Sequence, residues 1–391
     1  MGIKAFACVG SSTFHFAQVR DLTTGGLVPP LNIPNVGYGV AFNPDGTRMA
    51  VAHGSSPYIT VFNTSDWSKV APGPLLSFTG NDVAFSPDGT KMAAVGTATP
   101  YIAVFNTGDW SKVTAGSLSV PGAANSVAFS PDGTKMAVAH SSSPYITVFN
   151  TSDWSKVSAA GLVMNSSGNG VAFSPDGTKL VGCFHGAPNF NVFNTGDWSK
   201  MTVPSLGLAD SYVTARDIAF SPDGSKVFIA HSYPPYVTAL ATSDWTKIAI
   251  PGLAVTGAGY DVAFSPDGAR MAVCHATAPY ITVFNTGDWS KEVGVAPTAY
   301  GTQHRAAFAD VGARFVRATV RDVADAVASR EVRVRRRSDG ALQAEGRSSA
   351  ATGDFEAKVY AGDVEYDVQF MTEDGEPLND LFFARVTSSE T

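Results

Sequence analysis

An all-β protein built from a repeated unit is the fold class that the sequence predicts, and three observations predict it. The fifteen-residue phrase SPYITVFNTSDWSKV occurs twice without change, at 56–70 and at 143–157. A turn signal, Ser/Asn-Pro-Asp-Gly, recurs with its aspartates at 45, 88, 132, 176, 223 and 267, in steps of 43 to 47 residues. The six tryptophans of the chain keep the same interval. A period in the forties is the length of one four-stranded β-propeller blade.

The strands of one repeat follow from its residue pattern. The short apolar segment Val127–Ser130 is expected to be the innermost strand, and the Pro-Asp-Gly that follows supplies a hairpin turn. Lys135–His140 and Tyr145–Asn150 are expected to be the second and third strands. The segment that begins at Trp154 is expected to open a polar outer strand. Each repeat is therefore predicted to be an up-and-down antiparallel blade.

Closure of the ring is expected to involve both ends of the repeat region. A single blade buries too little surface to stand alone, and a closed ring leaves no bare sheet edge. Six full repeats run from about Val40 to Val293, and a partial one at 5–22 has the pattern of a second and a third strand. The missing first strand is found near Phe308, 44 residues after Phe264. We therefore predict a seventh blade shared by the termini, with a six-bladed ring and a loose N-terminus as the alternative.

Residues that are unchanged between the copies are expected to pack blade against blade. Each tryptophan is expected to fill the crevice between neighbouring blades, and a sixfold aromatic cofactor box is the alternative. Cys183 and Cys274 occupy a repeat position that alanine or valine holds elsewhere, so buried thiols are expected there. With Cys8, the three cysteines show neither metal-ligand spacing nor a disulfide framework, which favours a reducing compartment.

A second all-β module is predicted after Gly312. The last 91 residues hold 28 of the 61 charged side chains and none of the tryptophans. Segments such as Val332–Arg337 alternate at period two and are separated by turn residues. We therefore predict a β-propeller over 1–312 and a small β-sandwich of the Ig-like or transthyretin-like kind over 313–391. The arginines at 333, 335 and 337 are expected to form a solvated strand face, with a nucleic-acid contact as the alternative.

Composition excludes several classes of protein. No run of eighteen apolar residues is present, which argues against a membrane-spanning helix. The net charge of −7 argues against a general nucleic-acid binder, which needs a basic surface. The N-terminus has one lysine and a short apolar stretch, too weak a pattern for a signal peptide. Synthesis in a cytoplasm is therefore expected.

The repeat resembles known families. The segment VAFSPDGTKMAVAHSSSPYITVFNT resembles the lactonase-like, YVTN-type propeller family, over residues 1–312. That fold hosts enzymes, surface proteins and scaffolds, so the resemblance implies a fold rather than an activity. The phrase SPYITVFNTSDWSKV is similar to repeats of tailed-bacteriophage and prophage proteins. The last module is similar to carboxypeptidase-regulatory-like, transthyretin-like modules, although VADAVAS stands where those have a Gly-Asn-Pro turn.

Four histidines raise the question of a metal site. His53, His140, His231 and His275 end the second strand of four repeats, while Gly96 and Phe184 hold the same place in the others. These places belong to different blades, too far apart to ligate one ion. The imidazoles are therefore expected to serve the blade itself, bonded to backbone or to a hydroxyl.

The residues just before each innermost strand are expected to line one mouth of the axial channel. They vary between repeats: Tyr38-Gly39, Asn81-Asp82, Asn125-Ser126, Asn169-Gly170, Arg216-Asp217, Tyr260-Asp261 and His304-Arg305. The set holds three acids, two arginines and a histidine, without a nucleophile–base pairing. A solvated channel lining is expected. Binding of a cation or a polar ligand, and a lactonase-like or other hydrolytic site, are the alternatives.

A binding patch is predicted beside this mouth. The connection Val203–Asp217 carries three more residues than its counterparts, and the fifth repeat has Tyr233 where others have serine. We expect a cluster of Asp210, Tyr212, Arg216, Tyr233 and Tyr260, because tyrosine and arginine are enriched in binding hot spots. An irregular loop without a role is the alternative.

The resemblances together imply a virion protein. We expect a non-enzymatic structural and recognition protein of the bacteriophage tail, baseplate or fibre, made in the host cytoplasm. Its expected partners are other virion proteins and a receptor, either glycan or protein, on the host surface, with an oligomeric state set by virion symmetry. No cofactor, metal, nucleic acid or membrane insertion is expected. A lactonase-like hydrolase and a capsid or tail decoration protein are the alternatives.

Overall fold

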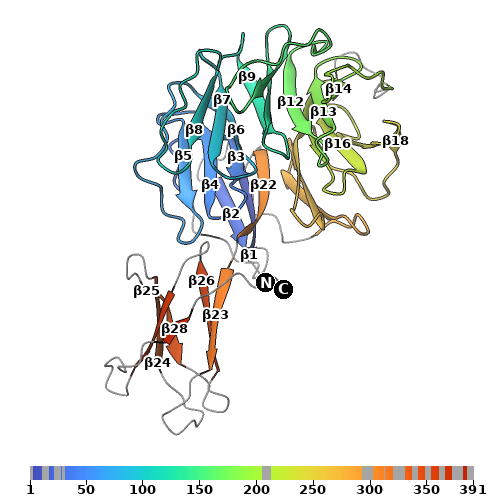
Figure 1. The fold of residues 1–391 in the computed structure, drawn as a ribbon. Coiled ribbons are helices and arrows are strands. Elements are labelled where there is room, and N and C mark those ends of the chain that lie inside the picture. Colours follow the sequence, from blue (N-terminus) through green and yellow to red (C-terminus); the bar gives the residue numbers. More distant parts are fainter. Residues whose placement is uncertain are drawn as a thin grey trace. The chain divides into compact units, whose positions relative to one another are not determined.

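The computed structural model of this chain describes two compact units. It covers residues 3–10, 17–21, 28, 31–204, 213–292 and 303–311, and the strands 313–319, 331–336, 342–347, 354–360, 366–371 and 382–384. One unit is Lys4–Asp310, and the other is Val311–Thr391 with Met1–Ile3. All regular elements in the described part are β-strands, so the all-β prediction is confirmed (Figure 1). None of the described residues belongs to a helix that could cross a membrane.

Most of the larger unit consists of sheets with one plan, in which the chain passes from an innermost strand to a second and a third. The first sheet has β3 (Gly37–Phe42), β4 (Arg48–His53) and β5 (Ile59–Asn63). The plan recurs in β6 (Gly80–Phe85), β7 (Lys91–Gly96) and β8 (Ile102–Asn106); β9 (Ala124–Phe129), β10 (Lys135–His140) and β11 (Ile146–Asn150); β12 (Gly168–Phe173), β13 (Lys179–Phe184) and β14 (Phe190–Asn194); β15 (Ala215–Phe220), β16 (Lys226–His231) and β17 (Val237–Ala241); and β19 (Gly259–Phe264), β20 (Arg270–His275) and β21 (Ile281–Asn285). Innermost strands of consecutive sheets lie side by side, from β3 beside β6 to β15 beside β19.

The two ends of the repeat region share one sheet. Its strands are β1 (Ile3–Gly10), β2 (Ala17–Asp21) and β22 (Gln303–Val311), in the order β2-β1-β22 (Figure 1). The rings of Phe6 and Phe308 lie 4.6 Å apart between their centroids. The predicted pairing of the termini is therefore confirmed, and β1 belongs to a sheet rather than to a loose end.

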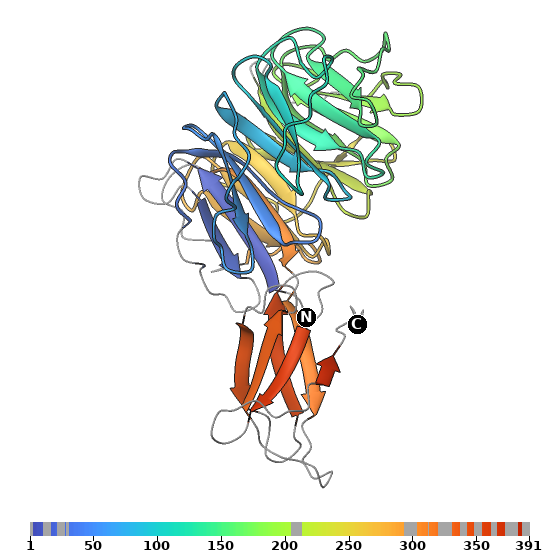
Figure 2. The same ribbon diagram turned by 60° about the vertical axis from the view of Figure 1, so that its left-hand side comes forward.

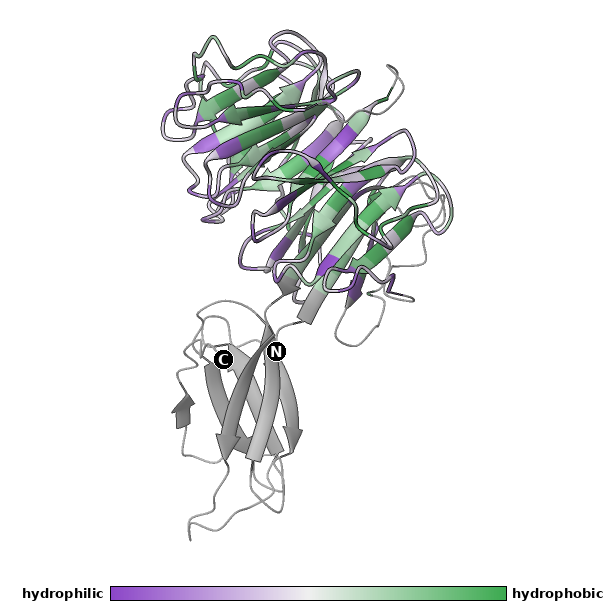
Figure 3. Cartoon of the chain, turned by 90° about the vertical axis from the view of Figure 1, so that its right-hand side faces the viewer, coloured by the Kyte–Doolittle hydropathy of each residue, from purple (hydrophilic) through white to green (hydrophobic). Residues whose placement is uncertain are grey.

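The core lies between neighbouring sheets, because both faces of each second strand are buried. In β10, Met136 and Val138 pack into a cluster shared with the preceding sheet. Ala137 and Ala139, on the other face, pack into the cluster shared with the next sheet. This two-sided burial explains why the second strands are almost continuously apolar. The strands of the larger unit are largely green, the colour of hydrophobic residues, in Figure 3. About 25 cal/mol per Å² of apolar surface buried makes these contacts the main stabilising term.

The tryptophans lie where the repeat pattern placed them. Trp154 is buried in the cluster formed by the second and third full sheets, and Trp198 in the next cluster along the chain. Trp245 is 4% exposed and meets Phe220 edge-on, with ring centroids 6.4 Å apart. The expectation that these tryptophans fill the crevices between sheets is confirmed.

The predicted outer strand is wrong for most repeats. In the described part, it forms a strand only as β18 (Lys247–Ile248), and elsewhere it is reduced to a bridge such as Phe149–Lys156. All six tryptophans, including Trp245 before β18, have a left-handed backbone conformation with φ of 57° to 62°, so extended structure can begin only after the tryptophan in each repeat. The turn before it is held by Asp153, which accepts hydrogen bonds from the amide and hydroxyl of Ser155.

The smaller unit contains two antiparallel sheets. One pairs β23 (Ala313–Thr319) with β26 (Asp354–Tyr360). The other has the order β25 (Leu342–Arg347), β24 (Glu331–Arg336), β27 (Tyr366–Met371) and β28 (Phe382–Ala384) (Figure 2). Strands therefore form in the region where period-two alternation predicted them.

Candidate functional site

A β-bulge at the start of the innermost strands β3, β6, β9, β12, β15 and β19 shapes the mouth of the axis. In β6, Gly80 pairs with Gly96 and Asp82 with Val95, so Asn81 has no partner in the ladder. The same irregularity falls at Tyr38, Asn125, Asn169, Arg216 and Tyr260. A bulge changes the direction of side chains, and here it lets two successive residues reach the next innermost strand. The mouth therefore has an outer layer at the bulged residues and an inner layer one residue further on.

Asparagines in the outer layer tie consecutive sheets together. Asn81 donates to the carbonyl of Ala124 at 2.9 Å, and Asn125 donates to Gly168 at 2.8 Å. Asn169 repeats the bond to Ala215, also at 2.8 Å. Three of the variable mouth positions are therefore occupied by structural amides.

Aspartates in the inner layer also tie consecutive sheets together, each through one carboxylate oxygen. Oδ2 of Asp261 accepts from the amide of Ala306 at 2.8 Å. Oδ2 of Asp82 accepts from Val127 at 3.1 Å, and Oδ2 of Asp217 accepts from Val262 at 3.4 Å. Each acid thus reaches the amide 45 residues further on, in the adjacent innermost strand.

The second oxygen of each aspartate faces Arg305, which comes from β22. Nη1 of Arg305 lies 3.1 Å from Oδ1 of Asp261 and 3.2 Å from Oδ1 of Asp217. Its Nε lies 3.9 Å from Oδ1 of Asp82. The three aspartates are only 4–8% exposed, so the expectation of a solvated channel lining is wrong at this layer. We call Arg305, Asp82, Asp217 and Asp261 the axial cluster.

Two glycines make room for the axial cluster. A Cβ atom at Gly39 would lie 2.7 Å from Cα of Asp82. A Cβ atom at Gly170 would lie 3.0 Å from Cα of Asp217 and 2.9 Å from the thiol of Cys183. Both positions are equivalent to the aspartates in the repeat, so their lack of a side chain keeps the inner layer from overfilling.

The axial cluster has more carboxyl groups than cations. Burial raises the pKa of Asp82, an effect that the charge of Arg305 only partly offsets. Burial, followed by the charge of Asp217, raises the pKa of Asp261 well above its ordinary value. Burial opposes the charge of Arg305, but the three aspartates outweigh it and raise the pKa of the guanidinium. The arginine is therefore a permanent cation within a group of acids that favours uptake of a proton.

The chemistry available to this cluster is that of a structural ion network. A general acid or base must present a free oxygen to a substrate. Here each aspartate has one oxygen on a backbone amide and the other toward Arg305. Among the described residues, no group of three His, Cys, Asp or Glu side chains is arranged to hold a metal ion.

Part of the predicted binding patch is brought together. The guanidinium of Arg216 lies 4.2 Å from the centroid of the Tyr260 ring, a cation–π contact between two half-buried side chains of the outer layer. Tyr233 lies in the loop between β16 and β17 and is 39% exposed. Asp210 and Tyr212 lie outside the described residues, as does the side chain of His304. Tyr38 is half-buried at the equivalent mouth position of the first sheet.

The four strand-end histidines bind a hydroxyl, as expected. Nε2 of His140 lies 2.9 Å from Oγ1 of Thr147, and the other three make the same contact to Thr60, Thr238 and Thr282. Where Gly96 or Phe184 replaces the histidine, Ala103 or Asn191 replaces the threonine. Burial lowers the pKa of each of these imidazoles to about 4, so the histidines are neutral near pH 7. This seven-residue correlation was visible in the sequence and identifies a structural pair.

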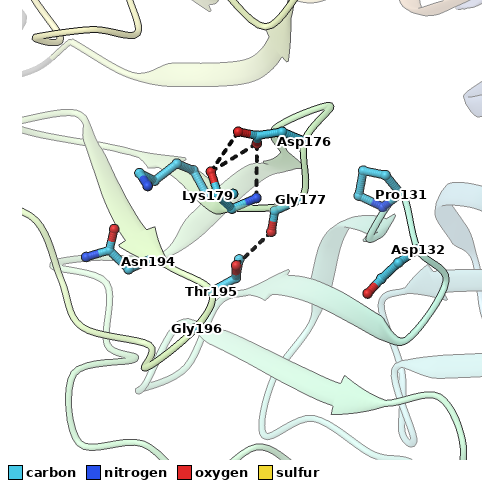
Figure 4. A pocket seen from close by; sticks show the side chains of 9 residues that line it. Pro131, Asp132, Asp176, Gly177, Lys179, Asn194, Thr195 and Gly196 are labelled. Atoms are coloured by element: carbon cyan, nitrogen blue, oxygen red, sulfur yellow. Dashed lines mark hydrogen bonds between the residues drawn. The ribbon is translucent and has the colours of Figure 1, made fainter.

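The opposite face carries the turns between first and second strands. The polar groups of these turns form hydrogen bonds with one another. A cavity of about 630 Å³ lies there between Asp132 and the turn around Asp176 (Figure 4). Asp176 accepts from the amide of Thr178 at 3.0 Å, and Thr195 donates to the carbonyl of Gly177 at 2.7 Å. Equivalent threonine bonds recur from Thr64 to Thr286. We call this surface the turn face; its polar groups are explained by the scaffold.

Comparisons with known proteins agree on the fold. No family model matches the chain, and no curated protein matches it. Among solved structures, it is similar to hydrazine synthase of Kuenenia stuttgartiensis, with 18% identity and a TM-score of 0.59 over 70% of this chain and 90% of that one. It is also similar to a putative 6-phosphogluconolactonase from Bacteroides uniformis, with 15% identity and a TM-score of 0.61 over 79% of this chain and all of that one. The larger unit therefore has a β-propeller-like fold, and at these identities the likeness extends to the fold alone.

Proposed function

We propose that this chain is a non-enzymatic structural and recognition protein of a bacteriophage virion, associated with the tail, baseplate or fibre. In this proposal, the sheets of the larger unit close into a seven-bladed propeller, and the last module is a small β-sandwich. Partners would be other virion proteins and a glycan or protein on the host surface. The repeat phrase supports the virion assignment through its resemblance to repeats of tailed-bacteriophage proteins. The last module supports it through its resemblance to carboxypeptidase-regulatory-like modules, a kind that phage tail and fibre proteins often carry.

One observation supports a non-enzymatic role: in each aspartate of the axial cluster, one carboxylate oxygen accepts a backbone amide and the other faces Arg305. Propeller enzymes place their catalytic groups at such a mouth. Here the acids join neighbouring sheets and enclose Arg305, which supports a scaffold whose variable loops are free for recognition. The cation–π pair of Arg216 and Tyr260 supports recognition at the outer layer.

A lactonase-like hydrolase is the second candidate, because one similar structure is described as a putative 6-phosphogluconolactonase. An assay of sugar-lactone hydrolysis by the purified chain distinguishes the hydrolase from the structural and recognition protein. We expect a rate equal to the uncatalysed rate, with and without added divalent cations. Turnover that is lost in Asp217→Asn but kept in Asn125→Ser would establish the enzyme.

Virion membership is tested on purified particles. We expect the chain to co-sediment with them, to be found by mass spectrometry, and to be located on the tail by gold-labelled antibody. Labelling over the capsid, together with host adsorption that persists without the protein, would instead support a decoration protein. Absence of the chain from particles would contradict the virion assignment.

A further inference from the structure

Two aspartates of the axial cluster approach the same nitrogen atom. Nη1 of Arg305 lies 3.1 Å from Oδ1 of Asp261 and 3.2 Å from Oδ1 of Asp217. The hydrogen bond of this nitrogen is directed at Asp261. None of the described residues donates a hydrogen bond to Oδ1 of Asp217, although its Oδ2 accepts the amide of Val262 at 3.4 Å. One inner oxygen of this pair therefore has an ionic neighbour but no hydrogen-bond donor.

Backbone contacts fix the direction of both carboxyl groups. Asp217 belongs to β15 and Asp261 to β19, and these innermost strands lie side by side. Oδ2 of Asp217 binds an amide of β19, and Oδ2 of Asp261 binds the amide of Ala306 in β22. Because each Oδ2 is held at the next strand, each Oδ1 is left at the axis beside Arg305. Neither carboxyl group can turn away from the other without breaking a bond between sheets.

The surroundings of this pair oppose two full negative charges. Asp217 and Asp261 are 8% and 4% exposed, so little water reaches either carboxyl group. Arg305 supplies one positive charge, which it also shares with Asp82, whose Oδ1 lies 3.9 Å from Nε. Burial, then the charge of Asp217, raises the pKa of Asp261, and a hydrogen bond with Asp217 adds to this effect, while Arg305 opposes it. Two adjacent buried carboxyl groups can hold one proton between them and titrate as a unit.

We propose that Asp217 and Asp261 share one proton, held between their Oδ1 atoms, and that this proton joins the sheet of β15 to the sheet of β19. The proton comes from solvent and supplies the hydrogen bond that Oδ1 of Asp217 otherwise lacks. When it is lost, two carboxylates repel each other across the junction of the two sheets. The pair is therefore a pH-dependent link in the ring, next to the sheet that the termini share. This proposal does not depend on the virion assignment.

The elements around the pair carry further ionisable groups. In the inner layer these are Arg305 and Asp82, and beyond it they are Cys183, Cys274, Arg216, Tyr260 and His304. Burial raises the pKa of the Cys183 thiol, which therefore stays neutral. Cys274 packs among apolar residues between sheets, and Arg216 lies over the ring of Tyr260 in the outer layer. The side chain of His304 lies outside the described residues. Arg305 and Asp82 are thus the charged neighbours of the pair within its own layer.

The pH dependence of chemical denaturation tests this proposal on the full chain. A proton held by the folded chain alone adds stability at low pH and is lost as pH rises, which raises the unfolding equilibrium constant by up to about tenfold per pH unit. The strand-end histidines contribute equally to wild type and variants, so the ratio of their unfolding constants isolates the pair. Between about pH 5 and pH 8, the ratio of wild type to Asp217→Asn, and to Asp261→Asn, should rise at least about tenfold, because either change leaves one carboxylate that ionises readily beside Arg305. The exposed control Asp88→Asn should give a constant ratio.

NMR of the amides of Val262 and Ala306 gives a second readout, which does not depend on the stability of a variant. These amides bond to the two members of the pair, so both should titrate with one common midpoint. Asp82→Asn keeps the pair and should keep that common titration. Two separate midpoints would overturn the proposal, as would a pH-dependent ratio for Asp261→Asn but not for Asp217→Asn, since the proton would then belong to Asp261 alone. A flat ratio for both variants would show that the folded chain holds no such proton.

Discussion

Nη1 of Arg305 lies 3.1 Å from Oδ1 of Asp261, while Oδ2 of the same carboxylate accepts the amide hydrogen of Ala306. One aspartate of β19 thus holds both the backbone and the side chain of β22. Since β22 pairs with β1, this contact links the sheet built from both ends of the repeat region to the sheet before it. Asp82 brings the second full sheet to the same guanidinium. The axial cluster is therefore placed to hold the ring closed.

Asp261→Asn should change the pH dependence of stability. The pKa of Asp261 is raised in the folded chain, so its contribution to stability is complete below about pH 3.8 and is lost as pH rises through the higher folded value. The wild type should therefore lose stability relative to Asp261→Asn as pH is raised from 4 toward neutrality. Melting curves of both proteins at matched ionic strength measure this difference. Parallel pH profiles would show that Asp261 is ionised as readily as an exposed acid.

Acid should destabilise the propeller through the strand-end histidines. Their pKa values are lowered from 6.5 to about 4, so the stability that they contribute is present above pH 6.5 and is lost as pH falls toward 4. NMR titration should show four imidazoles that remain neutral down to about pH 5. The double change His140→Phe/Thr147→Asn copies the pair found in the fourth full repeat and should reduce the acid sensitivity. An imidazole of this set that titrates near 6.5 would contradict the prediction.

Removal of β22 should open the ring. A chain ending at Glu292 lacks β22 and leaves the edge of β1 bare, together with three buried carboxylates without their cation. Bare sheet edges pair with other chains, so aggregation is expected on size-exclusion chromatography. A chain ending at Gly312 keeps β22 and is the matched control, which should stay soluble. Equal solubility and equal melting temperatures for the two truncated chains would show that closure does not need β22.

Sequence reasoning predicted the repeat, the strand order and the shared terminal sheet because these depend on local pattern. The turn at Pro131 and the apolar strand Lys135–His140 carry their signals within a few residues. The axial cluster was not predicted, although its residues had been placed at the mouth. Whether Asp261 is solvated or bonded to Arg305 depends on a bulge and on side-chain lengths across the axis.

The prediction of an outer strand is wrong for most repeats, whereas the prediction for the histidines is confirmed, and the two outcomes have related reasons. The left-handed conformation of Trp154 lets extended structure begin only after the tryptophan, in a segment whose composition alone is compatible with a strand. By contrast, His140 and Thr147 lie on paired strands, so their correlation between repeats reports a contact directly. Contacts within one repeat can therefore be predicted by comparing the repeats. Contacts across the axis cannot, because the residues there differ from one repeat to the next.

The stability of Arg305→Met tests the central claim most directly, namely that the mouth acids form a structural cluster held by one arginine. Chemical denaturation should show a loss of about 3–5 kcal/mol, because removal of one partner leaves buried charges uncompensated. Arg216→Met, at the half-buried outer layer, should lose only about 1 kcal/mol or less. Combining Arg305→Met with Asp82→Asn, Asp217→Asn and Asp261→Asn should recover part of the loss, because the uncompensated charges are gone. Arg305→Met with wild-type stability, or a combined variant less stable than Arg305→Met alone, would contradict the account.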